Sequence, residues 1–250
     1  MRYLLAAASV AMTAMAQAAD IRVLATPGIK EAYVELVPLF EKADGHKVVT
    51  TWVGTVDVMK RMKAGEVFDV VIVASNSLEE LTDTGRLMAG SRADVARSGV
   101  GVAVRAGAPK PDIGSPDALK RALLAAKSIG ISTGPSGVYL TELFQRMGLL
   151  EELKPKFRTP VSGAPVGELV AKGEAELGFQ QVSELIHFPG VAFLGPLPAE
   201  LQRITVFSGG VHAGSNEPDA ARALLKFLSA PEHAALLQKH GLEPGTPSPY

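Results

Sequence analysis

Residues 21–40, IRVLATPGIKEAYVELVPLF, decide the fold class of this chain. The run from Ile21 to Ala25 is short, apolar and rich in β-branched residues, which predicts a buried strand. After Thr26-Pro27-Gly28, the apolar residues recur at the spacing of one helix face, at Ile29, Tyr33, Leu36, Val37 and Phe40. A strand that passes through a turn of small residues directly into a helix is the repeating unit of a mainly parallel sheet.

The same strand–turn–helix pattern recurs along the chain. It is predicted at Lys47 to Ala64, Val70 to Thr82 and Ser128 to Met147. A helix over Val166 to Ala171 and a strand over Leu177 to Gln180 are predicted to follow. Two further β-rich runs, Gly99 to Arg105 and Arg203 to Ser208, are predicted to connect two lobes. The expected fold is therefore α/β with two lobes, each a mainly parallel sheet flanked by helices, and a ligand cleft between them. One lobe is expected to hold residues 19–103 and 208–250, and the other residues 104–207.

The chain ends also carry local signals. Ser229-Ala230-Pro231-Glu232 has the spacing of a capping box and predicts a helix start. At the other end, Arg2 precedes the apolar run Leu4 to Met15, and Ala16-Gln17-Ala18 fits a signal-peptidase site. This pattern predicts a cleaved signal peptide over residues 1–18 and a periplasmic protein. The apolar run is shorter than the roughly 20 residues that a membrane-spanning helix needs.

Composition excludes several classes of function. The chain has 250 residues, with 25 Lys and Arg against 26 Asp and Glu, a net charge of −1. Without a basic surplus, neither nucleic acid nor an anionic membrane surface is an expected partner. The absence of cysteine excludes disulfides, thiol catalysis and iron–sulfur centres. No metal-ligand, nucleotide-binding or serine-hydrolase motif is present, so neither a metal nor a cofactor is expected.

The turns that follow the strands are the expected ligand site. In open α/β sheets, ligands bind beyond the carboxyl ends of strands, where the N-termini of helices present free N–H groups. One such turn alone is more often structural, but several facing one cleft predict a site for a small anion held by neutral donors. The candidate residues at these turns are Gly28, Ile29, Gly54, Thr55, Ser75, Asn76, Ser136, Gly137, Gly163, Ala164, Gln180 and Gln181. Arg105 is expected at the cleft mouth, with Lys30 as a further cation, and Tyr139 lies beside one turn.

These turns resemble those of the periplasmic solute-binding proteins of ABC importers, closest to the molybdate-binding branch of the type II class. The matching segments are Ala25-Thr26-Pro27-Gly28, Met62 to Gly65 with Asp69 to Ile72, Pro135 to Tyr139, Leu177 to Phe179 and Phe227 to Glu232. The resemblance implies two lobes joined by two crossover strands. It also implies ligand contacts at Gly28, Gly54 or Thr55, Ser136, Gly163 and Gln181.

Two positions depart from that family pattern. Gly28 stands where the molybdate binders typically have serine, and Gln181 where they have a tyrosine hydroxyl. Losing two hydroxyl donors and gaining an amide favours an organic carboxylate over molybdate.

Two functions remain open. The first is a binding protein that captures a small anion and delivers it to an ABC permease, with a monomer as the default state and no catalytic residue. The alternative is a cofactor-independent aconitate isomerase, since such enzymes resemble this branch. That reaction needs a base for an allylic proton and cations for the carboxylates. The candidate bases are His212, Glu168 and Glu184, and the candidate cations are Arg105 and Lys30.

Overall fold

The computed structural model describes residues 20–245. The predicted signal peptide lies outside this range. The strands are β1 (Asp20–Ala25), β2 (Lys47–Trp52), β3 (Val70–Ala74), β4 (Ala93–Arg105), β5 (Ile129–Ile131), β6 (Phe157–Arg158), β7 (Leu177–Gln181), β8 (Val191–Pro196), β9 (Ile204–Val211) and β10 (Glu243–Pro244). The α-helices are α1 (Lys30–Asp44), α2 (Thr55–Lys63), α3 (Ser75–Asp83), α4 (Pro116–Ala125), α5 (Pro135–Arg146), α6 (Leu150–Leu153), α7 (Val166–Ala171), α8 (Val182–Leu185), α9 (Pro218–Leu228) and α10 (Ala234–Lys239). The 3-10 turns are η1 (Pro27–Ile29), η2 (Lys154–Lys156), η3 (Ala199–Leu201) and η4 (Pro231–His233).

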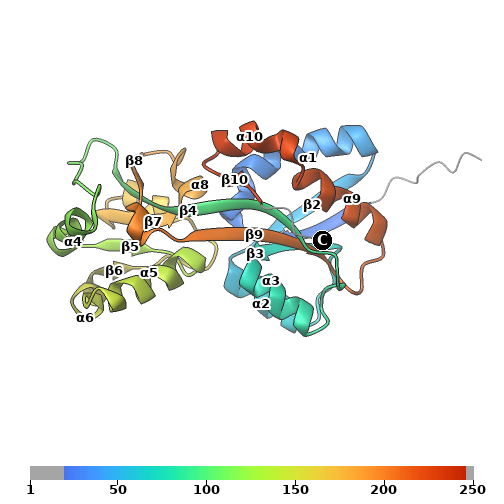
Figure 1. Ribbon diagram of the computed structural model, residues 1–250, viewed down its shortest axis with the longest axis horizontal. Coiled ribbons are helices and arrows are strands. Elements are labelled where there is room, and N and C mark those ends of the chain that lie inside the picture. The colour runs from blue at the N-terminus through green and yellow to red at the C-terminus, as the bar shows by residue number, and fades with distance from the viewer. Residues whose placement is uncertain (1–19, 246–250) are drawn as a thin grey trace, which may run out of the picture.

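The strands follow one another in the order β2-β1-β3-β9-β4-β7-β5-β6, with β10 and β8 also paired to β4. The group β2-β1-β3 is parallel, and so is the group β7-β5-β6. Each parallel group has its own helices, and the long strands β4 and β9 run between the two groups (Figure 1). The predicted two-lobed α/β fold is therefore confirmed.

Strand β4 changes partners where it crosses between the lobes. It pairs with β9 as far as Gly99↔Ile204, and from Val100↔Gln181 onward it pairs with β7. The side chain of Gln202 supports this change, because its amide accepts from Val100 N at 2.8 Å and donates to Val100 O at 2.9 Å. We propose that the lobes meet near Gly99, a few residues before the expected boundary at residue 103.

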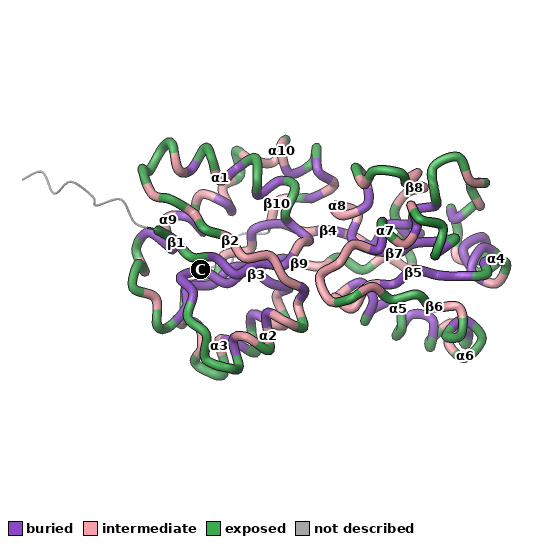
Figure 2. The backbone as a smooth tube through the Cα atoms, turned by 180° about the vertical axis from the view of Figure 1, so that it is seen from behind, coloured by how far each residue is buried: buried purple, intermediate pink, exposed green. Residues whose placement is uncertain are grey.

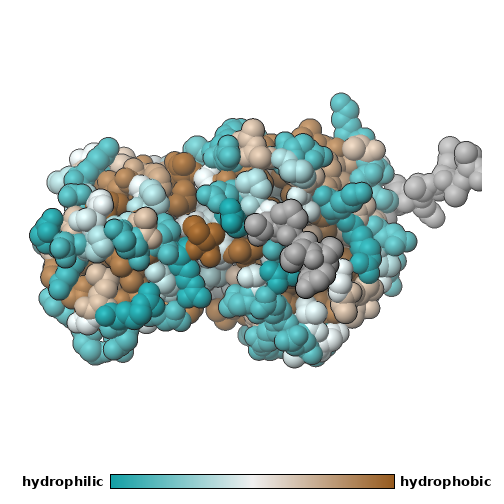
Figure 3. All heavy atoms as spheres, in the orientation of Figure 1, coloured by the Kyte–Doolittle hydropathy of each residue, from teal (hydrophilic) through white to brown (hydrophobic). Residues whose placement is uncertain are grey.

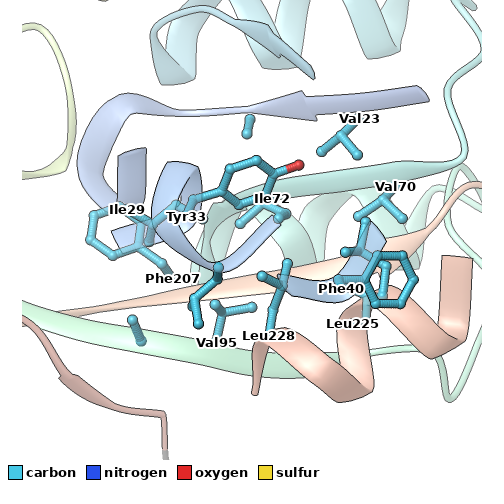
Figure 4. Close-up of a cluster of buried hydrophobic side chains, with 14 of the residues drawn as sticks. Val23, Ile29, Tyr33, Phe40, Val70, Ile72, Val95, Phe207, Leu225 and Leu228 are labelled. Carbon is cyan, nitrogen blue, oxygen red and sulfur yellow. The ribbon is translucent and has the colours of Figure 1, made fainter. Parts of the chain in front are cut away.

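Alternating residues of the central strands build two cores in the first lobe. Val23 and Ile72 face α1 and α9, whereas Leu24 and Val73 face α2 and α3. Figure 4 shows the first of these cores, in which Phe207 from β9 lies beside Ile29. A separate buried cluster fills the second lobe, so buried segments run through both lobes in Figure 2.

The predicted capping box at Ser229 is wrong. Its hydroxyl donates to Leu225 O at 2.9 Å and to Lys226 O at 3.3 Å, so it closes α9 and does not cap the following turn. Ala230 takes the N-cap position of that turn. A serine hydroxyl can bond to the carbonyl four residues before it in a helix, and Ser229 makes that local bond here.

The surface is mixed in character. Hydrophilic residues spread over the visible face of both lobes, with apolar residues between them (Figure 3). Within residues 20–245, no helix combines the length and the apolar character needed to cross a bilayer.

Candidate functional site

A small cavity lies where the two lobes meet, and we call it the central pocket. Its volume is about 40 Å³. It is lined by Thr26, Pro27, Gly28, Gly54, Thr55, Ser132, Thr133, Gly134, Pro135, Ser136, Gly163, Ala164, Gln180, Gln181, Glu184 and Phe207. Except for Phe207 in β9 and Gln180 and Gln181 at the end of β7, these residues belong to the turns after strands and to the first turns of helices. The carboxyl ends of strands from both lobes therefore converge on one site, as expected for an open α/β fold.

Two longer helices begin at the pocket, one from each lobe. Thr55 is the first residue of α2, and Ser136 lies in the first turn of α5. Neither helix has a side-chain N-cap. Their first N–H groups and partial positive charge are thus directed at the pocket, an arrangement that favours an anion. The Ser136 hydroxyl bonds to the Ser132 hydroxyl at 2.9 Å, which fixes the entry to α5.

Thr26 has a hydroxyl group that no other residue in the range 20–245 uses as a donor. The residue is 3% exposed, and its Oγ1 has no hydrogen-bond partner in the described chain. A buried hydroxyl without a partner costs free energy. A ligand in the central pocket would supply that partner.

Glu184 is the ionisable residue of the central pocket. It lies in α8, directly after β7, and its Oε1 accepts a hydrogen bond from Gln180 Nε2 at 2.7 Å. Burial raises the pKa of Glu184 to about 8, although the Gln180 bond opposes that shift. All other residues lining the pocket are neutral. The site therefore combines neutral donors with one carboxyl group that changes charge near neutral pH.

Close contacts between backbone segments explain two of the glycines. A Cβ atom on Gly54 would lie 2.5 Å from Gly163 N, and one on Gly163 would lie 2.6 Å from Gly54 N. Gly163 also has a φ of +80°. The two turns come from different lobes. They can approach each other this closely only because neither position carries a side chain.

Gly28 lacks a side chain for a different reason. A Cβ atom there would overlap the ring of Phe207, which occupies the space that a serine side chain would need. Phe207 on β9 therefore explains why this chain has glycine where the molybdate binders typically have serine, although the two residues are far apart in the sequence.

Gln181 lines the pocket, but its polar atoms bond within the protein. With the amide nitrogen facing β4, it donates to Ser98 O at 3.1 Å and Gly99 O at 3.3 Å, while the oxygen accepts from Thr205 Oγ1 at 3.0 Å. Gln181 thus ties together the strands that cross between the lobes.

The other predicted residues divide into three groups by position. Gly28, Gly54, Thr55, Ser136, Gly163, Ala164 and Gln180 line the central pocket together with Gln181 and Glu184. Ser75, Asn76 and Tyr139 line a larger neighbouring pocket of about 780 Å³, which shares Thr55 and Gly134 with the central one. Ile29 is buried in the core, and Gly137 packs against the Ser132 carbonyl.

Arg105 does not lie at the cleft mouth as expected. It is the last residue of β4 and lines a separate pocket in the second lobe with Ala108 and Gly173. Because β4 pairs with β7 and β8 over its second half, it carries its end away from the lobe junction. Lys30 lines a pocket of about 420 Å³ that adjoins the central pocket through Pro27, Gly163 and Glu184.

His212 and Glu168 are not brought to the central pocket. His212 follows Val211, which pairs with Val70, whereas Phe207 pairs with Ala74 at the pocket end. Five residues of strand place His212 roughly 17 Å from Phe207. Its Nδ1 accepts from Gly214 N at 3.0 Å, and burial lowers its pKa. Glu168 is exposed and pairs with Lys172 at 2.6 Å.

Some pocket residues were not predicted. Thr26, Ser132 and Thr133 are short polar residues in turns already recognised as candidates, so their place after a strand was a usable signal. Phe207 gave no such signal, because its role depends on pairing with β3. The described residues contain no cluster of His, Asp and Glu suited to a metal ion.

The fold and site define a two-lobed binding protein with its ligand site between the lobes. The chain belongs to the family described as bacterial extracellular solute-binding protein, which matches residues 21–243.

Individual proteins are also similar to this chain. An aconitate isomerase from Pseudomonas sp. is 38% identical over 95% of this chain and 92% of its own length. The molybdate-binding protein ModA of Azotobacter vinelandii is 27% identical over 90% of each chain. The solved periplasmic molybdate-binding protein of Azotobacter vinelandii superposes with a TM-score of 0.75 at 22% identity, covering 89% of this chain and 98% of that one.

Proposed function

We propose that this chain binds a small organic polycarboxylate between its lobes and moves a proton within it, interconverting trans- and cis-aconitate. The observation that carries the proposal is Glu184, a carboxyl group in the central pocket whose pKa is raised to about 8. Such a group can accept and return a proton near neutral pH. The aconitate isomerase that is 38% identical over nearly the whole chain supports the same reaction.

The reaction needs no oxidant, reductant or second substrate. The Glu184 carboxylate takes a proton from the methylene carbon beside the double bond. The electron pair of that C–H bond forms the new double bond, while the old one opens toward its far carbon. Glu184 then returns a proton to that carbon, so the product has the composition and charge of the substrate. The helix N-termini of α2 and α5 would stabilise the negative charge that develops on the carboxylates.

The size of the cavities bears on how the substrate lies. At about 40 Å³, the central pocket is too small for a whole tricarboxylate, whereas the adjoining pocket has about 420 Å³ and shares Glu184 with it. A substrate that reaches from one into the other would have Glu184 beside it and Lys30 near an outer carboxylate. This assigns Lys30, and not Arg105, as the cation that pairs with the substrate.

The test is turnover by the purified mature protein. We expect trans-aconitate to yield the cis isomer in proton NMR spectra, at a rate proportional to protein concentration. In deuterated water, the methylene position of the product is expected to carry deuterium. Folded protein that gives no cis isomer at any concentration would overturn the proposal.

A second function, capture of an anion for import, is favoured by the neutral donors that line the rest of the pocket. The two functions differ in their response to pH. A pure binder holds its anion best while Glu184 is protonated, so its affinity falls as pH rises through about 8. An isomerase needs the carboxylate, so its kcat/KM rises over the same range.

Ligand preference can be measured with either function. A thermal-shift panel would compare both aconitates, citrate, molybdate, tungstate and sulfate, because any native-state ligand raises the melting temperature. We expect the organic anions to give the largest shifts, and a panel without any shift would contradict both functions.

We also propose that residues 1–18 are a signal peptide and that the mature protein is a periplasmic monomer. If it serves import, its partner is an ABC permease. The N-terminal sequence of protein from a periplasmic fraction is expected to begin at Ala19, and light scattering is expected to give the mass of one chain.

A further inference from the structure

Gln180 links two segments that meet at the central pocket. It is the fourth residue of β7 and only 3% exposed. Its side-chain Oε1 accepts from Val166 N, the first residue of α7, at 2.7 Å. Its Nε2 donates to Glu184 Oε1, in α8, also at 2.7 Å.

The orientation of this amide is fixed by chemistry. A backbone N–H can only donate, so the atom of Gln180 that faces Val166 must be the oxygen. The NH₂ group therefore faces Glu184, and Glu184 Oε1 is always an acceptor in that bond. When Glu184 carries a proton, the free position for it is Oε2.

We propose that Gln180 is a positioning residue that holds Glu184 by Oε1 and leaves Oε2 as the atom that exchanges protons with the ligand. This inference rests on the proposed function of the site. Gln180 was expected to contact the ligand directly, but its oxygen and one N–H are already bonded to Val166 and Glu184. A side chain held in this way loses little freedom when it acts, which is what a proton-transfer group requires.

The other charged groups near Glu184 do not hold it. Lys30 and Glu31, at the start of α1, and His187, after α8, line the adjoining pocket together with Glu184. Within residues 20–245, none of the three makes a hydrogen bond or ion pair with Glu184. The His187 ring bonds instead to Lys239 O at 2.8 Å. Gln180 is therefore the residue whose loss should change how Glu184 titrates.

Two variants of the full mature chain test the role. Gln180→Met keeps the volume of the side chain but removes both bonds. Gln180→Glu keeps an acceptor for Val166 N–H, but it replaces the amide donor with a second carboxyl group beside Glu184. Gln145→Met changes an exposed glutamine of α5 that lies outside the pocket and serves as the matched control.

Two readouts are needed for each variant. The first is the titration midpoint of Glu184, followed by ¹³C NMR of labelled glutamate carboxyl groups and assigned by its loss in Glu184→Gln. The second is the pH profile of kcat and KM with trans-aconitate. We expect both Gln180 variants to raise the midpoint by about one pH unit or more, because a donor to the carboxylate is lost and, in Gln180→Glu, a second carboxylate stands beside it. We expect kcat at pH 7.5 to fall about tenfold or more with KM within threefold.

The outcomes separate the two ideas. Absence of turnover in the wild type overturns the proposed reaction, whatever the variants do. An active wild type, with an unchanged Glu184 midpoint and unchanged kcat in both folded Gln180 variants, overturns the positioning role alone. A shift confined to Gln180→Met also overturns it, because that variant alone loses the bond to Val166.

Discussion

Helices α7 and α8 begin with nearly the same sequence and have very different surroundings. Val166-Gly167-Glu168 opens α7 and Val182-Ser183-Glu184 opens α8. The Glu168 side chain is 49% exposed and pairs with Lys172, four residues further along the helix. Glu184 has Phe188 at the corresponding position, lines the central pocket and is bound by Gln180. The comparison shows that the role of a first-turn glutamate depends on what it faces.

The first prediction tests this difference through catalysis, where the effect is largest. Replacing the base should lower kcat for aconitate isomerisation by about 10²–10⁴-fold in Glu184→Gln. Glu168→Gln should change kcat less than twofold, because its partner is an exposed lysine outside the pocket. Steady-state assays with trans-aconitate provide the measurement. Equal losses in the two variants would show that the difference between α7 and α8 has no functional meaning.

The second prediction concerns stability and pH. The pKa of Glu184 is raised from 4.5 to about 8 in the folded protein. Between these values the folded state holds a proton that the unfolded chain has released, so the free energy of unfolding falls as pH rises from about 4.5 to about 8. Relative to Glu184→Gln, which stays neutral, the wild type should lose on the order of 10 °C in melting temperature over that range.

Calorimetry at several pH values measures this difference. Glu168→Gln serves as the control and should follow the wild type at every pH. A constant difference in melting temperature between wild type and Glu184→Gln from pH 5 to pH 8 would contradict the raised pKa.

The third prediction compares how the two helices are held, and its effect is the smallest. Ser183 Oγ, in α8, donates to Gly28 O at 2.7 Å and is buried. Ser183→Ala leaves that carbonyl without this donor and should cost about 1 kcal/mol, or about 2–4 °C. In α7, Lys172→Met breaks an exposed ion pair and should cost less than about 0.5 kcal/mol. Thermal unfolding at pH 7 distinguishes them, and a larger loss in Lys172→Met would reverse the expected order.

Much of the fold was predictable because its signals are local. The strands around Ile21 and Val70 are runs of β-branched residues, and the helices after them have one apolar face. The turns between them carry short polar residues, which is why most of the predicted anion-site residues line the central pocket. Resemblance to the molybdate-binding branch pointed to the same turns.

Two of the predicted site residues lie away from the central pocket, and in both cases distant segments are the reason. Arg105 was placed by its position in a crossover strand, but the pairing of that strand with β8 carries it away from the cleft. His212 was predicted from its position after a strand. That strand, β9, is antiparallel to β3, so it ends beside the start of β3, away from the pocket. In both cases the direction of the strand partner mattered, and a single sequence does not specify it.

By itself, the sequence determined the alternation of strands and helices, the neutral small residues of the turns and the absence of cysteine chemistry. These follow from local preference and composition, which each segment carries with it. Tertiary packing alone put Glu184 in the central pocket and left Glu168 outside it, filled the space beside Gly28 with Phe207, and used the polar atoms of Gln181 for bonds at the lobe junction. Burial and partner choice set the pKa and accessibility of a side chain, and both depend on residues far away in the chain.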